Sequence, residues 1–144
     1  MLNALRICLC ILGVTAVAIA LSILTRGAEA TAALGEQAFD LMIRARPSSS
    51  GHWPATMDSE LRFYAALWGA YGVAALGCAR SSGAVVEWTP WVAAVFFVGG
   101  VGRVVSLLAV GPPHPFFSFL MWIELLLPVL LMALWLWIRE RTAT

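Results

Sequence analysis

Two opposite charges inside neighbouring apolar segments are the residues best placed to do chemistry. Arg103 lies nine residues before Pro112, and Glu124 lies nine residues after Pro115. If both segments are helices that fold back at the turn 111–115, a rise of ~1.5 Å per residue places each charge ~13 Å from the turn, near the middle of a ~30 Å hydrocarbon layer. An unpaired charge at that depth is costly, so we expect Arg103 and Glu124 to face inward and to pair.

Further polar side chains are expected to enter the membrane from the same face as this turn. They are Glu60, Arg62, Tyr64 and His114. Together with Arg103 and Glu124 they would line one polar funnel, and these six residues form the predicted ligand-binding site. Pro128 follows Glu124 by four residues and has no N–H, so the Glu124 carbonyl loses its helical partner. No catalytic residue is assigned, although Glu124 is the candidate acid/base.

Each of these features also has a purely structural interpretation. An ion pair between Arg103 and Glu124 can fix the register of two helices without binding any ligand. A histidine in a proline-rich turn is commonly a solvated loop residue. The stripe of Tyr64, Trp68 and Tyr71 at helical spacing is typical of lipid contact or core packing, as well as of an aromatic wall around a ligand. The sequence leaves these alternatives open.

Composition restricts the protein class more firmly than any motif does. Of 144 residues, 61% are hydrophobic and 12% are charged, about half the ~25% charged fraction of soluble domains. All nine basic residues are arginines and form no basic stripe, which excludes nucleic-acid binding. The three cysteines have no metal-ligand spacing, and no nucleotide-binding or nucleophile motif is present. We therefore expect no metal or motif-bound cofactor, and only a quinone or a lipid as a possible ligand.

The apolar residues fall into four blocks, which predict an all-α membrane protein with a single domain over residues 1–144. We expect a four-transmembrane-helix bundle with spans at about 4–24, 59–78, 90–110 and 116–138. The first apolar stretch exceeds the ~7–15 residues of a signal-peptide core, so we expect it to be a retained helix. Asp58-Ser59-Glu60 is the expected start of the second span, and Thr89-Pro90 that of the third.

The loop 26–57 is the only sizeable part expected outside the membrane. It is predicted to carry a short amphipathic helix on the membrane surface. The apolar side of that helix would hold Leu34, Ala38, Leu41, Met42 and Ala45. Residues 47–51 would end this helix, and residues 52–54 would return the chain to the interface.

Four spans place both termini on one side of the membrane. That side holds Arg6, Arg80, Arg139 and Arg141 next to short segments, where the positive-inside rule applies best, so we expect both termini in the cytoplasm. An aromatic belt would mark the same interface, formed by Trp88, Trp91, Trp135 and Trp137.

Several segments resemble a bacterial family of unknown function. They are residues 60–68, residues 99–106, the Gly111-Pro112 turn and the Glu124 and Pro128 pair. That family is a small four-helix membrane domain grouped with the DoxX-like proteins. The resemblance implies a location in the bacterial inner membrane. Some DoxX-like proteins are associated with quinone-linked oxidoreductase complexes, which implies a redox partner as an expectation only, since fold does not fix function.

Three functions remain compatible with the sequence. The leading hypothesis is a non-catalytic module that binds a lipophilic ligand or acts as an accessory subunit. The alternative is a quinone-linked or lipid-modifying enzyme subunit that uses Glu124 as acid/base and holds an anionic or carbonyl group with Arg103. The third is a proton-coupled carrier. The second and third spans carry more small residues than the packing of one helix pair needs. We therefore expect a homo-oligomer or a larger membrane complex, in addition to contact with membrane lipid.

Overall fold

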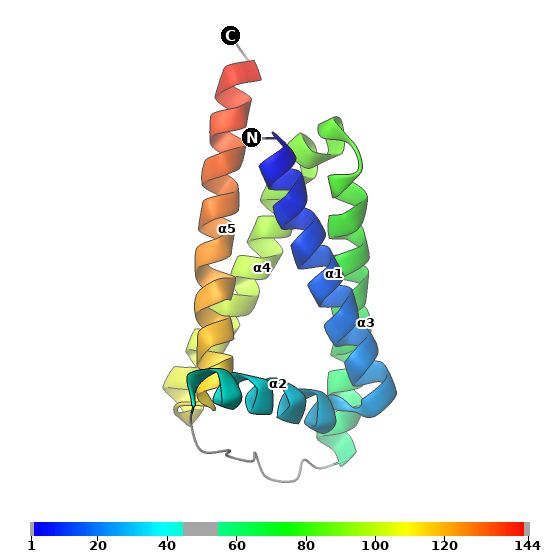
Figure 1. Ribbon diagram of the computed structural model, residues 1–144, viewed down its shortest axis with the longest axis vertical. Helices are drawn as coiled ribbons and strands as arrows, with labels where there is room; N and C mark the ends of the chain where they lie inside the picture. The colour runs from blue at the N-terminus through cyan, green and yellow to red at the C-terminus, as the bar shows by residue number, and fades with distance from the viewer. Residues whose placement is uncertain (1, 45–54, 143–144) are drawn as a thin grey trace.

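The computed structural model describes residues 2–44 and 55–142, and these form five helices and no strand. The helices are α1 (Leu2–Arg26), α2 (Ala28–Ile43), α3 (Ala55–Ala79), α4 (Ser82–Val110) and α5 (Pro115–Thr142). α1 packs mainly against α3, and α4 mainly against α5 (Figure 1). α2 crosses one end of the bundle, and both termini lie at the other end. The predicted all-α fold, with a helix in the first loop, is confirmed.

Three of these helices, α1, α4 and α5, are long and apolar enough to cross a membrane. α3 has the same length as α1, 25 residues. The sequence of α3 is less apolar than that of α1, because it contains Arg62, two tyrosines and several glycines. The sequence-based count of four spans is therefore not confirmed.

The start of α4 differs from the prediction. The helix begins at Ser82, because the Ser81 hydroxyl oxygen caps it by accepting the N–H of Ala84 at 3.1 Å. Thr89, the expected cap, lies inside the helix, and its hydroxyl donates to the carbonyl of Val85. The other spans begin and end within a few residues of their expected bounds.

Pro90 is tolerated inside α4 because a neighbouring helix replaces the hydrogen bond that it removes. A proline has no N–H, so the carbonyl of Val86 loses its helical donor. The indole Nε1–H of Trp135 on α5 donates to that carbonyl instead. The same contact fixes α5 against the first half of α4.

The predicted helix in the first loop is present, but its orientation is unexpected. Ala28, Ala32, Glu36 and Asp40 form the buried side of α2. The apolar side predicted for membrane contact is exposed on the far side from the bundle, where Leu41 is 77% exposed. Ala45 and the predicted break and return at 47–54 lie outside the described residues.

A polar clamp joins α1, α2 and α3 at the end of the bundle that carries α2. Asp58 accepts the N–H of Ala28 through Oδ1 at 3.1 Å and pairs with Nε of Arg62 through Oδ2 at 2.7 Å. Arg62 also donates to the carbonyl of Leu24 at 2.7 Å. The hydrogen bond from Arg62, and then that from Ala28, lower the pKa of the Asp58 carboxyl below its usual value. Asp58 lies in the first turn of α3, as the sequence predicts, and from there it also caps α2.

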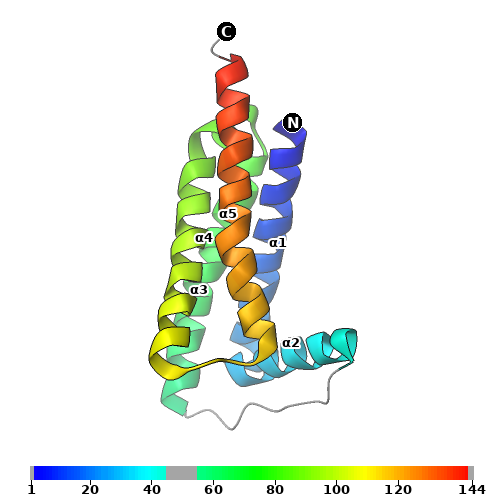
Figure 2. The ribbon, with the colours of Figure 1, turned by 90° about the vertical axis from the view of Figure 1, so that its left-hand side faces the viewer.

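The apolar core lies in the half of the bundle near the termini. Leu5 and Leu9 of α1, Val85 of α4 and Leu131 of α5 are all fully buried there. Figure 2 shows α2 and the connection between α4 and α5 together at the opposite end. The helix of the long loop, α2, and the α4–α5 turn therefore lie at one end, as expected, and Arg103 and Glu124 lie in that half.

We expect Trp135→Phe to lower the free energy of unfolding in detergent by about 1 kcal/mol, because the Val86 carbonyl then lacks a donor. In a Pro90→Ala background the N–H of residue 90 can donate to the Val86 carbonyl. Trp135→Phe should then lower the free energy of unfolding clearly less. Trp122→Phe, on an exposed face of α5, is the control. Equal losses in both backgrounds would contradict this account of Pro90.

Candidate functional site

The expected ion pair between α4 and α5 is present. Nε–H of Arg103 donates to Oε2 of Glu124 at 2.6 Å. Glu124 is buried, with 8% of its surface exposed, whereas the Arg103 side chain is 37% exposed. The prediction from equal spacing about the turn is therefore confirmed for the geometry of the pair.

A glycine on α4 allows the two backbones to approach at the level of this pair. A Cβ atom at Gly100 would lie 3.1 Å from both the carbonyl carbon and the Cβ of Glu124. Arg103 follows Gly100 by three residues, so both face α5. The ring of Phe117 lies 5.9 Å from Cζ of Arg103 and supports the guanidinium from α5.

One side of the pair is open. Among the described residues, only Nε of the Arg103 guanidinium has a hydrogen-bond partner. A Cβ atom at Gly99 would meet only Oε2 of Glu124, at 4.0 Å. The terminal nitrogens of Arg103 thus remain available as donors, and the space at Gly99 lies next to Oε2 of Glu124 in the same pair.

The other residues of the predicted funnel are not gathered around this pair. Arg62 belongs to the clamp with Asp58, and Glu60 is exposed. Tyr64 is exposed and contacts Phe63 edge-on at 5.7 Å. The funnel is wrong as a single cluster because α3 packs mainly against α1 rather than beside α5.

His114 lies under α2 rather than in solvent. Its side chain is 10% exposed, and Nε2 lies 3.3 Å from Oδ1 of Asp40. Nδ1 accepts the backbone N–H of Phe116 at 3.2 Å. The interpretation of His114 as a solvated loop residue is therefore wrong.

Sequence reasoning missed the two buried acids of α2. Glu36 and Asp40 lie one turn apart, opposite the apolar side of the helix. That spacing was visible in the sequence, but their burial depends on the packing of α2 onto α5. Gly35 permits this contact, since a Cβ atom there would lie 2.5 Å from the ring of Phe116.

The aromatic stripe on α3 serves packing at two of its three positions. Trp68 and Tyr71 stack with ring centroids 5.0 Å apart, and both stack on Phe96 of α4. The Tyr71 hydroxyl donates to the carbonyl of Val92 at 2.9 Å. These contacts join α3 to α4.

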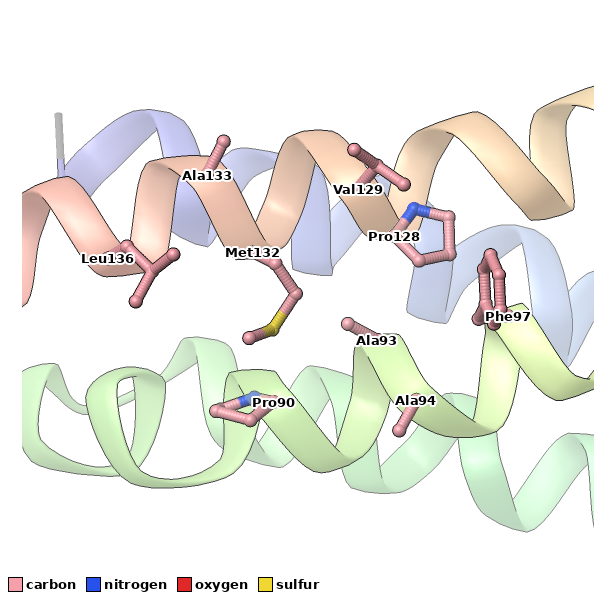
Figure 3. A pocket seen from close by; sticks show the side chains of 9 residues that line it. All are labelled: Pro90, Ala93, Ala94, Phe97, Pro128, Val129, Met132, Ala133 and Leu136. Carbon is pink, nitrogen blue, oxygen red and sulfur yellow. The ribbon is translucent and has the colours of Figure 1, made fainter.

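An apolar groove of about 500 Å³ runs between α4 and α5 (Figure 3). Its lining includes Pro90, Ala94, Phe97, Pro128 and Met132. α1 and α3 pass behind it in Figure 3, so it opens on the outer face of the bundle. Such a groove suits an acyl chain of the surrounding bilayer and offers no polar group. Within residues 2–44 and 55–142, no cluster of acids, histidines and cysteines could hold a metal ion.

Two adjacent glycines provide a test of how the pair is positioned. Gly100→Ala should separate α4 from α5 and lower the melting temperature in detergent by several degrees, because the new methyl group meets the backbone of Glu124. Gly99→Ala places the same methyl group at an ordinary contact distance and should leave the melting temperature nearly unchanged. Equal effects of the two substitutions would contradict the close approach at Gly100.

Comparison with known proteins identifies a family but no described activity. Neither a curated protein nor a solved structure matches the chain. Residues 4–136 match a domain family, and this range includes most of α1 and α5 and all of the helices between them. The expected membership of a family of unknown function is thus confirmed. The chain belongs to the family described as Domain of unknown function (DUF4345).

Proposed function

We propose that this protein is a small integral membrane protein that binds a lipophilic ligand at the Arg103–Glu124 pair without catalysing a reaction. Four spans are part of this proposal, with α3 crossing the membrane beside α1. The length of α3 and its packing along α1 support that count. The observation that carries the ligand proposal is the partly exposed guanidinium of Arg103, with its terminal nitrogens unbonded among the described residues.

A ligand accounts for this arrangement better than a helix clip does. An ion pair that only joins two helices is most stabilising when both groups are buried and all donors are used. Here one hydrogen bond joins the pair, and 37% of the Arg103 side chain is exposed. Donors in an apolar medium require acceptors. A bound molecule that supplies an acceptor to the terminal nitrogens of Arg103 would complete the site.

The geometry favours binding over catalysis by Glu124. An acid/base residue must reach the reacting atoms of its substrate. Glu124 is buried against Gly100 and already accepts a hydrogen bond from Arg103, so the guanidinium is the more exposed group of the pair. The quinone-linked or lipid-modifying enzyme therefore has less support than the binding module.

The cellular setting follows from charge and composition and is part of the same proposal. Arg6, Arg80, Arg139 and Arg141 all lie at the end of the bundle that carries the termini, which favours cytoplasmic termini in a bacterial inner membrane. A DoxX-like relationship and a role as an accessory subunit in a homo-oligomer or larger complex stay predictions. A Cβ atom at Gly77 or Gly102 would meet nothing within 4 Å, so a helix of a neighbouring subunit could pack at either position.

Blocking the open side tests the proposed function. We expect the protein purified in mild detergent to carry a lipophilic molecule detectable by native mass spectrometry. Gly99→Leu should remove most of that bound species, because its side chain fills the space beside the pair. Gly83→Leu adds the same side chain near the start of α4, at the opposite end of that helix from the pair, where a Cβ atom meets nothing within 4 Å, and should retain the ligand.

Matched melting temperatures would show that both variants fold. A wild-type protein without any bound lipophile, or a ligand that survives Gly99→Leu as well as Gly83→Leu, would contradict binding at this pair.

A further inference from the structure

The charges of the pair restrict the head group of the ligand, if the proposed binding function holds. Arg103 and Glu124 carry opposite charges and together are neutral. A carboxylate or phosphate bound at Arg103 would leave one net negative charge among apolar helices. An uncompensated charge in that medium is strongly unfavourable. A neutral ligand keeps the site neutral.

The free groups of the site restrict the ligand further. The exposed part of the pair is the guanidinium, and its nitrogens only donate hydrogen bonds. Glu124, the acceptor, is 8% exposed and already receives a hydrogen bond from Arg103. A ligand therefore meets donors rather than acceptors. A carbonyl oxygen, which only accepts, matches the exposed donors of the guanidinium.

With the hydrocarbon layer taken to begin at the α4–α5 turn, as in the proposed four-span arrangement, the depth of the pair excludes the most abundant membrane lipids. Glu124 lies nine residues into α5 from Pro115, ~13 Å along the helix axis at ~1.5 Å per residue. The phosphate groups of phospholipids remain at the surface of the ~30 Å hydrocarbon layer. Uncharged lipids have no such restriction, and their polar group can lie at the level of the pair.

We infer that the Arg103–Glu124 pair binds an uncharged lipid through a carbonyl group, such as an ester or a ketone on a long apolar chain. The terminal nitrogens of Arg103 donate to the carbonyl oxygen. Gly99 leaves space next to the pair, where a Cβ atom would lie 4.0 Å from Oε2 of Glu124, and the centroid of the Phe117 ring lies 5.9 Å from Cζ of Arg103. Phospholipids and ionised fatty acids are rejected by depth and by charge, respectively.

Three matched probes test this inference on the wild-type protein in nanodiscs. They are methyl palmitate, ionised palmitate and hexadecane, each with the same photoreactive diazirine in the chain. Mass spectrometry of the cross-linked peptides measures labelling of α4 and α5. We expect the ester to label these helices roughly tenfold more than the acid or the alkane, as one additional hydrogen bond predicts. Arg103→Lys, which keeps the charge but replaces the planar guanidinium, should reduce that preference.

The possible outcomes separate this inference from the proposed function. If no probe labels the wild type more than the Gly99→Leu variant, binding at this pair is wrong, and the inference with it. If the acid labels as well as the ester, the site binds a lipid but does not exclude charge. If the alkane labels as well as the ester, the carbonyl plays no part. Either of the last two results overturns the inference while leaving a lipophilic site in place.

Discussion

The need to neutralise a charge within apolar helices is the constraint on which the α4–α5 half of this structure depends. Arg103 and Glu124 meet at 2.6 Å only if the two helices reverse at a fixed position and approach closely. Gly111 permits the reversal, since its φ of 111° is strained for any residue with a side chain. Gly100 permits the approach. One ion pair thus explains why glycine stands at both positions.

The two halves of the bundle have different tasks. Near the termini, Leu5, Val85 and Leu131 are fully buried, and the Trp135 indole joins α5 to α4. This half therefore contains the well-packed apolar core. Toward α2, polar contacts replace the core: the Asp58 clamp, the His114 contact with Asp40 and the Arg103–Glu124 pair. A binding site in this second half can open to a ligand without disturbing the core. This division agrees with the proposed role of the pair.

Hydropathy and spacing were sufficient to predict the helices and the ion pair. Long apolar blocks identify α1, α4 and α5, and equal distances from one turn identify Arg103 and Glu124 as partners within a single hairpin. Contacts between hairpins were not predictable in this way, because the sequence does not state which helix lies beside which. Arg62 was therefore assigned to the funnel rather than to Asp58, and the burial of Glu36 and Asp40 was missed. The start of α4 was misplaced because Ser81 and Thr89 are both competent caps, and only tertiary packing explains how Pro90 fits inside the helix.

Arg103 and Glu124 stabilise the bundle by neutralising each other within the apolar helices. The most direct measurement is the free energy of unfolding in detergent for the wild type, Arg103→Met, Glu124→Met and the double variant. Each single substitution leaves one uncompensated charge and should cost about 3–5 kcal/mol. The double variant leaves no charge and should recover most of that loss. Single substitutions without effect, or losses that simply add in the double variant, would contradict the claim.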